Sequence, residues 1–228
     1  MITLALDGRP LVVAGTDTGV GKTFVACCLL AVLRARGVRV RAMKPVESGC
    51  AATVNADEDG SRLAHAAGQT EPGSSLVRLA APLAPPDAAD LEGARLDYGA
   101  WLSTARRLAS ACELLVVEGA GGLLSPLTWE RTVLDLAVDT HARALLVAAD
   151  RLGSINHTRL CALALAQRGV PLAGIVLSAP REPDGATGRN AAALARVLPG
   201  IPLASLARCA SLAEGMDACT AVLDVARP

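Results

Sequence analysis

The strongest chemical signal in the sequence is the segment Gly15-Thr16-Asp17-Thr18-Gly19-Val20-Gly21-Lys22-Thr23, which follows an apolar stretch and precedes an amphipathic one. Glycine-rich backbone that runs into a helix presents N–H groups to phosphate, a lysine reaches the β and γ phosphates, and a threonine hydroxyl can bind Mg²⁺. The common pattern of such loops places glycine at position 16, where this chain has Thr16 and carries Gly15 one residue earlier. The context still predicts a phosphate-binding loop.

The chain uses lysine sparingly: Lys22 and Lys44 are the only lysines among 22 basic residues. Lysine supplies a compact, mobile charge that the planar guanidinium of arginine does not. Lys44 opens the segment Lys44-Pro45-Val46-Glu47-Ser48-Gly49 after a second apolar stretch. A lysine at a strand end is often a plain surface residue, but the nearby phosphate loop favours a role on a phosphoryl group or an anionic substrate.

Two acidic segments are candidates for metal binding. Glu118 ends an apolar stretch and is followed by Gly119-Ala120-Gly121-Gly122, and a carboxylate at such a strand end beside a phosphate loop favours Mg²⁺ over plain solvation. The run Asp57-Glu58-Asp59 precedes a helical segment, and on these residues alone we prefer a helix N-cap.

Apolar stretches alternate with helical patterns along the chain, which predicts an α/β fold with a largely parallel central sheet and helices on both faces. The expected strands are Leu11 to Ala14, Val38 to Met43, Leu114 to Val117, Ala144 to Ala148 and Leu172 to Val176. The expected helices are Thr23 to Arg36, closed by Gly37, then Asp59 to Ala67, Tyr98 to Ala111, Ile155 to Gln167 and Asn190 to Val197. Ligands of such sheets bind at the carboxyl ends of the strands.

Four prolines, Pro72, Pro82, Pro85 and Pro86, predict one long loop from about Thr70 to Leu91. Repeats and a clear linker are both missing from the sequence, so we expect a single domain over residues 1–228.

Composition excludes several classes of protein. The 22 basic and 22 acidic residues give a net charge of 22 − 22 = 0, which argues against nucleic acid or an anionic membrane surface as partner. Apolar stretches end well short of the roughly 18 residues of a membrane span, and no secretory signal is evident. We interpret the seven cysteines as reduced, buried residues of a cytoplasmic protein, and the three histidines lack metal-ligand spacing.

With these motifs assembled, the chain resembles the dethiobiotin synthetase family. Gly15 to Thr23 resembles its GTDTxVGKT loop, Lys44 to Gly49 its KPVxSG segment, Glu118 to Gly122 its VEGAGG segment, and Leu152 to His157 its LGxINH turn. The stretch Ala84 to Gly93 is similar to its proline-rich segment. The four motifs occur in the family's order between about Leu11 and Val176, which is far more specific than the loop alone.

The resemblance implies a P-loop NTPase-like enzyme of biotin biosynthesis, active as a homodimer with its substrate site at the subunit interface. Such an enzyme forms dethiobiotin from 7,8-diaminononanoate, CO₂ and ATP or another nucleoside triphosphate, with Mg²⁺. A substrate amine takes up CO₂ as a carbamate, the γ phosphate activates it, and the neighbouring amine closes a cyclic urea.

The resemblance also implies roles for individual residues. Lys44, Lys22 and Thr18 would be catalytic, and Thr23, Asp59 and Glu118 would hold the metal, with Asp59 preferred to Asp57 by its distance from the Ala-Ala-Gly that ends the helix. Nucleotide would be bound by Gly19, Val20, Gly21, Lys22, Thr23, Phe24, Asp59, Glu118, Gly119, Ala120, Gly121 and Ser178. Substrate would be bound by Thr18, Ser48, Gly153, Ser154, Ile155 and Asn156, the last four from the partner subunit.

The chain departs from the family in the parts that would read the base. Some members have Glu where Gly19 stands, Asn-Asp where Ser178-Ala179 stands, and an Ile-Pro-Trp segment where Leu206-Ala207-Arg208 stands. One rival class, the glutamine-dependent amidases, needs a further domain for which 228 residues leave no room. A partition-type ATPase would carry lysine at Asp17, and a non-catalytic nucleotide-binding regulator remains the alternative.

Overall fold

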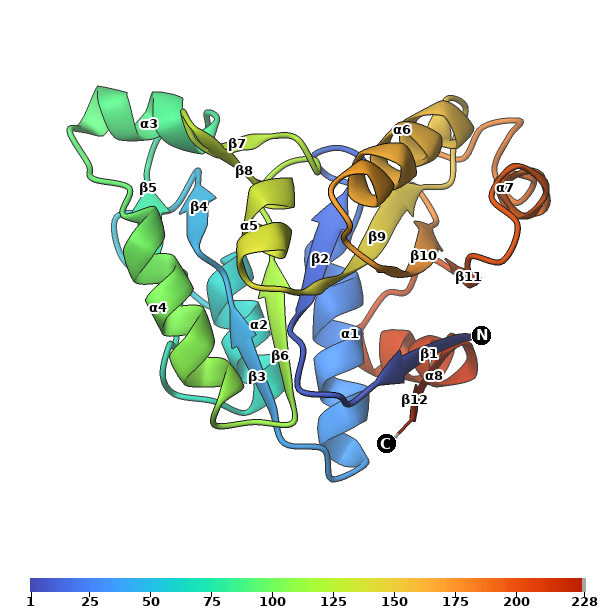
Figure 1. Cartoon of the computed structure of the whole chain (residues 1–228), viewed down its shortest axis with the longest axis horizontal. Coiled ribbons are helices and arrows are strands. Elements are labelled where there is room, and N and C mark those ends of the chain that lie inside the picture. Colours follow the sequence, from blue (N-terminus) through green and yellow to red (C-terminus); the bar gives the residue numbers. More distant parts are fainter. Residues whose placement is uncertain (227–228) are drawn as a thin grey trace.

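A parallel sheet forms the centre of the molecule in the computed structural model, which describes residues 1–226. Within these residues the sheet has six strands in the order β11-β10-β9-β2-β6-β3, and every neighbouring pair is parallel (Figure 1). The strands are β2 (Leu11–Gly15), β3 (Val40–Met43), β6 (Leu114–Glu118), β9 (Arg143–Ala149), β10 (Leu172–Ser178) and β11 (Leu203–Leu206). This arrangement confirms the α/β class with a parallel sheet.

Helices cover both faces of this sheet because successive strand residues point to opposite sides. Leu11 and Val13 join the apolar cluster that packs under α1 (Lys22–Ala35), α2 (Asp59–Ala67) and α8 (Leu212–Val222). Val12 and Ala14 join the cluster under α4 (Tyr98–Ala109), α5 (Val133–Asp139) and α6 (Ser154–Gln167). With both faces buried, the strands are apolar over most of their length. The charged exceptions lie on an edge strand, as Arg41 of β3 does, or at strand ends, as Arg143 and Glu118 do.

The remaining elements lie around this core. They are the helices α3 (Pro85–Glu92) and α7 (Asn190–Val197) and the short strands β1 (Ile2–Ala5), β4 (Val46–Ser48), β5 (Val77–Leu79), β7 (Pro126–Thr128), β8 (Arg131–Thr132) and β12 (Leu223–Ala226). All five predicted strands and all five predicted helices are present, with ends at most two residues from those expected. The sequence patterns missed β11, α3, α5, α8 and the short strands outside the main sheet, all of which are short or lack a clear apolar period.

The prediction of one long loop from Thr70 to Leu91 is wrong. The segment contains β5, which pairs with β4, and most of α3. Pro85 and Pro86 occupy the first two positions of α3, where the missing N–H groups have no helical partner and the fixed φ favours the helix. The prolines therefore start a helix here, and Gly93 in the left-handed region ends it.

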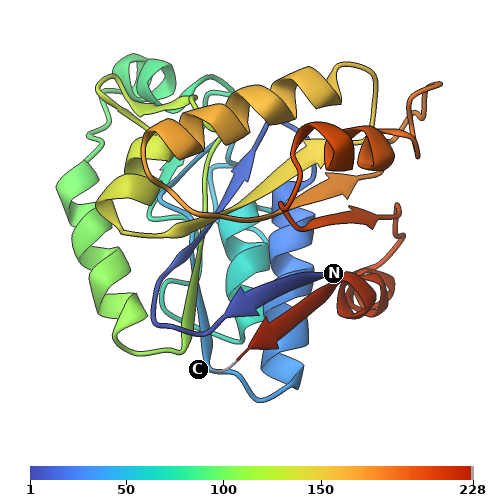
Figure 2. The same ribbon diagram turned by 45° about the vertical axis from the view of Figure 1, so that its right-hand side comes forward.

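The two ends of the described chain meet beside α1. β1 pairs in parallel with β12, and Figure 2 shows these two strands next to each other, with α8 alongside. The guanidinium of Arg143 at the start of β9 donates to the carbonyl of Ala5 and to Asp7 Oδ1, the latter at 2.8 Å. These contacts hold the N-terminal strand against the main sheet.

All seven cysteines lie in the described residues and are free thiols. Cys27, Cys28, Cys50 and Cys219 are buried, as expected. The interpretation is wrong for Cys112, Cys161 and Cys209, which are partly exposed. Cys112 and Cys161 lie at the edge of an apolar cluster, and Cys209 lines the larger pocket described below. Over residues 1–226, no helix combines the length and apolar character needed to cross a membrane.

Candidate functional site

The predicted phosphate loop connects β2 to the N-terminus of α1, at the carboxyl ends of the strands. Gly21 takes the N-cap position of α1 with φ 94°, a left-handed conformation that glycine adopts without strain. A Cβ at Gly15 would lie 2.7 Å from the Asp17 carbonyl oxygen and 3.0 Å from Lys22 Nζ. Because Gly15 has no side chain, Lys22 can fold back over the loop.

Lys22 lies over this loop and is nearly buried. Its ammonium donates a hydrogen bond to the Asp17 carbonyl at 3.1 Å. Burial, followed by the nearby charge of Lys44, lowers the pKa of Lys22 below its usual value. An anion at the loop would stabilise the charged form of this side chain.

Lys44 lies at the centre of a charged cluster behind the loop. Its ammonium donates to Glu118 Oε1 at 2.6 Å, to Asp59 Oδ2 at 2.9 Å and to the Gly119 carbonyl at 3.4 Å. Thr23 Oγ1 donates to the same Glu118 oxygen at 2.9 Å. The ends of β3 and β6 and the starts of α1 and α2 thus bring together residues that are far apart in the sequence.

Burial and charge oppose each other within this cluster. Burial alone lowers the pKa of Lys44, but the carboxylates of Glu118 and Asp59 outweigh it and raise that pKa above its usual value. Burial raises the pKa of Glu118, and the Lys44 ammonium offsets this only in part. Burial also raises the pKa of Asp59, but the Lys44 ammonium outweighs burial and holds this pKa below its usual value. Lys44 and Asp59 therefore stay charged across the neutral range.

The cluster has the donor atoms that a divalent cation prefers. Glu118 Oε2 is buried and has no hydrogen-bond partner, and the Thr23 hydroxyl and Asp59 add further oxygens. Among the described residues no group of three or more His, Cys, Asp or Glu could hold a metal ion. Mg²⁺ is typically held by one or two carboxylates together with substrate phosphates, so the residues present fit such an ion.

The acidic run before α2 divides into three different environments. Asp59 is the first residue of α2 and contacts Lys44, whereas Asp57 is exposed. Glu58 occupies the N-cap position, but its side chain makes no cap hydrogen bond and instead pairs with Arg78. The N-cap interpretation is thus right for the position of Glu58 and wrong for the side-chain bond.

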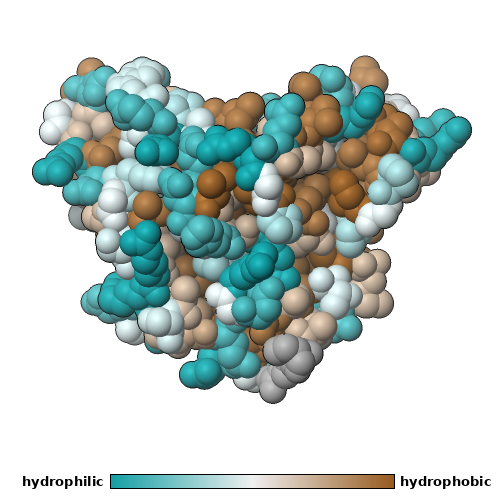
Figure 3. All heavy atoms as spheres, in the orientation of Figure 1, coloured by the Kyte–Doolittle hydropathy of each residue, from teal (hydrophilic) through white to brown (hydrophobic). Residues whose placement is uncertain are grey.

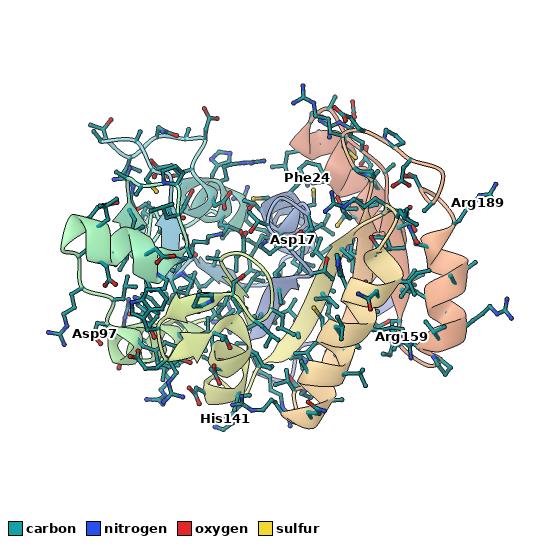
Figure 4. All side chains as sticks on the ribbon, turned by 90° about the horizontal axis from the view of Figure 1, so that it is seen from above. Asp17, Phe24, Asp97, His141, Arg159 and Arg189 are labelled. Atoms are coloured by element: carbon teal, nitrogen blue, oxygen red, sulfur yellow. The ribbon has the colours of Figure 1, made fainter. Side chains whose placement is uncertain are left out.

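Two adjoining pockets open at this edge of the sheet. The first, of about 360 Å³, is lined by Thr18, Gly19, Gly21, Lys22, Thr23, Phe24, Lys44, Glu47, Ser48, Asp59, Arg62, Ala120 and Gly121. The second, of about 640 Å³, shares Thr18, Gly19, Gly21 and Phe24 with the first and adds Val20, Ser178 and the segments after β10 and β11. Figure 4, seen from above, places Asp17 and Phe24 near the middle of the molecule.

The glycines after Glu118 lie in tight surroundings. A Cβ at Gly119 would come within 2.5 Å of Val133, and one at Gly121 within 2.5 Å of Ser125 Oγ. A Cβ at Gly21 would lie 2.7 Å from Ser178 Oγ, so the hydroxyl at the end of β10 contacts the phosphate loop. Most of the residues expected to bind nucleotide therefore surround one continuous opening.

The turn Gly153 to Asn156 lies apart from these pockets and lines neither of them. It forms the N-terminus of α6, with Gly153 at the N-cap in a left-handed conformation. The hydroxyl of Ser154 is buried and donates to the Ala149 carbonyl. Leu152, just before the turn, is 81% exposed. Within one chain, this turn and the lysines are not brought together.

Sequence reasoning missed several charged residues that line the two pockets, among them Glu47, Arg62 and Arg151. Arg62 lines the smaller pocket, one helical turn after Asp59, and this spacing of three was a usable signal. Arg151 lines the larger pocket and pairs with Asp17 of the phosphate loop at 3.6 Å. It directly precedes the Leu-Gly-Ser-Ile-Asn-His motif, but nothing in the sequence indicated that it faces the loop.

Comparison with known proteins gives two kinds of match. A sequence model described as an AAA domain matches residues 9–212. The protein named ATP-dependent dethiobiotin synthetase BioD from Anaeromyxobacter sp. (strain Fw109-5) is 46% identical over 209 residues, covering 90% of this chain and 93% of that protein. The protein of the same name from Caulobacter vibrioides (strain NA1000 / CB15N) is 42% identical over 174 residues, covering 75% and 80%.

Solved structures share the fold at low identity. The septum site-determining protein MinD from Pyrococcus horikoshii OT3, complexed with Mg-ADP, gives a TM-score of 0.58 at 16% identity, over 92% of this chain and 86% of that one. A nucleotide-binding protein from Archaeoglobus fulgidus in complex with ADP gives 0.54 at 16% identity and the same coverage. These structures show the fold of P-loop NTPases, and the sequence matches show that the chain belongs to the dethiobiotin synthetase family.

Proposed function

We propose that this chain is a dethiobiotin synthetase, a ligase that closes the ring of dethiobiotin from 7,8-diaminononanoate, CO₂ and ATP. The observation that carries the proposal is the meeting of Lys22, Lys44, Thr23, Asp59 and Glu118 around one pocket beside the phosphate loop. The similarity to the named ATP-dependent synthetases supports the same activity.

The reaction needs positive charge where oxygen atoms accumulate negative charge. One amine nitrogen of the substrate bonds to the carbon of CO₂ and gives a carbamate. A carbamate oxygen then attacks the γ phosphorus and ADP leaves, and the second amine attacks the carbamate carbon as phosphate leaves. Lys22 and Lys44 both line the pocket and can stabilise the charge on the phosphoryl group and carbamate during these steps.

Thr18 and Ser48 line the same pocket as the two lysines, and we place them as hydrogen-bonding groups for the substrate. Thr23, Asp59 and Glu118 would hold Mg²⁺, which would neutralise phosphate charge during the transfer. The chain's own contribution is mainly to position the reacting groups, because phosphoryl transfer depends on alignment and electrostatic stabilisation.

We also propose a homodimer in which Gly153 to Asn156 bind substrate for the partner's pocket. Four leucines near this turn support it: Leu124, Leu152, Leu160 and Leu163 are all more than half exposed. Leu124 and Leu160 line a further pocket with Thr16 and Asp17 of the phosphate loop, which connects the apolar surface to the site. Figure 3 shows apolar atoms on the α6 side of the notch at the top of the molecule. Apolar surface of this kind commonly marks an interface.

We further propose that residues 1–228 work as one domain and that the protein is cytoplasmic. Residues 227 and 228 lie outside the described part of the chain. The seven free thiols support a reducing compartment, because exposed cysteines in oxidising compartments tend to pair.

Phosphate release tests the proposed activity directly. Purified protein with ATP, Mg²⁺ and bicarbonate should release phosphate only when 7,8-diaminononanoate is added, and mass spectrometry should detect dethiobiotin in the same amount. Nucleotide binding without phosphate release would favour the alternative, a non-catalytic nucleotide-binding regulator.

Sedimentation tests the dimer. Replacing both Leu160 and Leu163 by Glu should convert a dimer to monomers and reduce turnover, because charges would be buried in the interface. Leu91→Glu is the matched control, since Leu91 is 71% exposed on α3. A wild-type monomer with full activity would overturn the proposed interface.

A further inference from the structure

We propose that Glu47 is a positioning residue that fixes the start of α2 and so sets Asp59 against Lys44. The inference rests on the proposed function, because it gives Glu47 a part in building the metal-binding side of that site. Among the described residues, Glu47 makes no hydrogen bond to Lys44 or to Glu118.

The carboxylate of Glu47 accepts three hydrogen bonds from two segments. Its Oε1 accepts from the Asp59 backbone N–H at 2.7 Å, and its Oε2 accepts from the Gly60 backbone N–H at 3.0 Å. The hydroxyl of Ser75 also donates to Oε2. Glu47 thus caps the N-terminus of α2 in place of the residue at the N-cap, although Glu47 lies in β4 and is distant in the sequence.

The local N-cap residue cannot do this because its side chain is committed elsewhere. Glu58 pairs with Arg78, whose Nε and Nη2 donate to it at 2.7 and 2.6 Å. Without Glu47, the first N–H groups of α2 would lose their carboxylate partner. Their interaction with a negative charge is also favoured by the helix dipole.

The same short segment of chain carries both the cation and the cap. Lys44 follows β3 and Glu47 lies three residues later in β4, so one stretch delivers the ammonium and the carboxylate. Glu47 holds the backbone of Asp59 while Lys44 bonds its side chain at 2.9 Å. Asp59 is therefore fixed at two points, and its remaining carboxylate oxygen takes a defined position.

The first turn of α2 packs very closely against the Ser75 segment at Gly60. A Cβ at Gly60 would lie 2.1 Å from the Ser75 backbone nitrogen and 2.4 Å from Ser75 Oγ. The segment before β5 thus sits directly on the first turn of α2. This close approach allows one carboxylate to bind the helix start and the Ser75 hydroxyl together.

Binding of Mn²⁺ with a non-hydrolysable ATP analogue, followed by electron paramagnetic resonance, tests this role without turnover. Glu47→Ala removes the cap, and Glu47→Gln keeps its shape while replacing one acceptor oxygen by a donor NH₂ group. The matched control is Asp97→Ala, because the Asp97 carboxylate also caps a helix start, although as the local N-cap residue of α4, accepting the Ala100 N–H at 2.9 Å. Figure 4 shows Asp97 at the edge of the molecule, far from Asp17 and Phe24.

We expect Mn²⁺ to bind at least fivefold more weakly to Glu47→Ala, and more weakly to Glu47→Gln by a smaller factor. Asp97→Ala should keep the wild-type affinity even though its melting temperature falls. If Glu47→Ala fails to fold, Glu47→Gln decides alone: an affinity within twofold of wild type would overturn the inference. Equal losses in Asp97→Ala and the Glu47 variants, or no Mn²⁺ binding by the wild type, would also overturn it. A wild type that binds Mn²⁺ but forms no dethiobiotin would instead refute only the proposed function.

Discussion

The position of Lys44 decides how the site is charged. Its ammonium is almost fully buried and bonds two carboxylates, one of them on the fully buried Glu118. Removing one partner of a buried pair leaves an uncompensated charge, which typically costs about 3 to 5 kcal/mol. Lys44 therefore stabilises the charged cluster in addition to the role toward substrate that we propose for it, and a variant must separate these two effects.

Lys44→Ala should reduce turnover on the order of 100-fold or more, because it removes a charge that stabilises phosphoryl transfer. It should also lower the melting temperature in the absence of Mg²⁺, since Asp59 and Glu118 lose their counter-ion. Lys44→Met, which keeps most of the side-chain volume, separates charge from packing. Steady-state kinetics and thermal unfolding measure the two effects, and wild-type turnover in either variant would contradict the catalytic role.

Glu118→Ala should lose the Mg²⁺-dependent part of nucleotide affinity, by about tenfold or more. The reason is that Glu118 supplies the buried carboxylate, including the oxygen without a hydrogen-bond partner. Calorimetry with Mg²⁺ and with a chelator gives the two affinities. Glu130→Ala, in the exposed turn between β7 and β8, is the control, and equal Mg²⁺ dependence in Glu118→Ala and wild type would contradict the assignment.

At the scale of elements, α5 supports the end of β6. Thr132 and Asp135 form a reciprocal capping box at its start, in which each side chain accepts from the other's backbone N–H. Val133, the first residue of α5, packs so closely on Gly119 that a Cβ there would lie 2.5 Å away. The capping box therefore fixes the start of α5, whose Val133 packs against the backbone that follows Glu118.

Asp135→Asn should destabilise the protein by about 1 kcal/mol at pH 7, the usual value of such a cap. Burial of Asp135 opposes ionisation, but hydrogen bonds from Thr132 and Arg168 prevail, so its pKa lies below the usual value of 3.8. A depressed pKa adds stability that is complete above the unfolded value and is lost as pH falls through the folded one. The difference from wild type should therefore shrink below about pH 4.

Urea unfolding at several pH values measures this difference. Asp217→Asn, at an exposed position on α8, controls for the loss of one negative charge. A difference that stays constant between pH 7 and pH 3 would show that the charge of Asp135 does not matter.

At the scale of the molecule, the larger pocket is built from four segments that are distant in the sequence. The phosphate loop meets the ends of β9, β10 and β11 there, with Arg151, Ser178, Arg181 and Arg208 among the lining residues. Arg181 and Arg208 are exposed, so water screens them. Small and solvated side chains discriminate weakly between bases.

ATP, CTP and GTP should therefore all support turnover, with specificity constants within about tenfold, or about 1.4 kcal/mol. The affinity should come mainly from the phosphates, which every triphosphate shares. Steady-state kinetics with each nucleotide tests this prediction. A preference of several hundredfold for ATP would mean that groups after β10 or β11 read the base.

Local patterns were sufficient for much of the fold and for the phosphate loop. The strands and α1 follow from continuous apolar stretches and a 3.6-residue period, which short segments encode by themselves. The α3 helix was missed because prolines favour both loops and helix starts. The pairing of β5 with β4, which fixes the course of the Thr70 to Leu91 segment, is evident only in the structure.

The sequence by itself determined that a phosphate loop, two lysines and an acidic strand end would meet at one edge of a parallel sheet, because strand ends of such sheets coincide. The family resemblance preferred Asp59 to Asp57, but only the tertiary structure decided how Asp59 reaches Lys44. Glu47 of β4 accepts from the backbone N–H of Asp59 at the start of α2, while Glu58 pairs with Arg78. Such contacts join residues distant in sequence, so they depend on how whole elements pack and leave no local pattern to recognise.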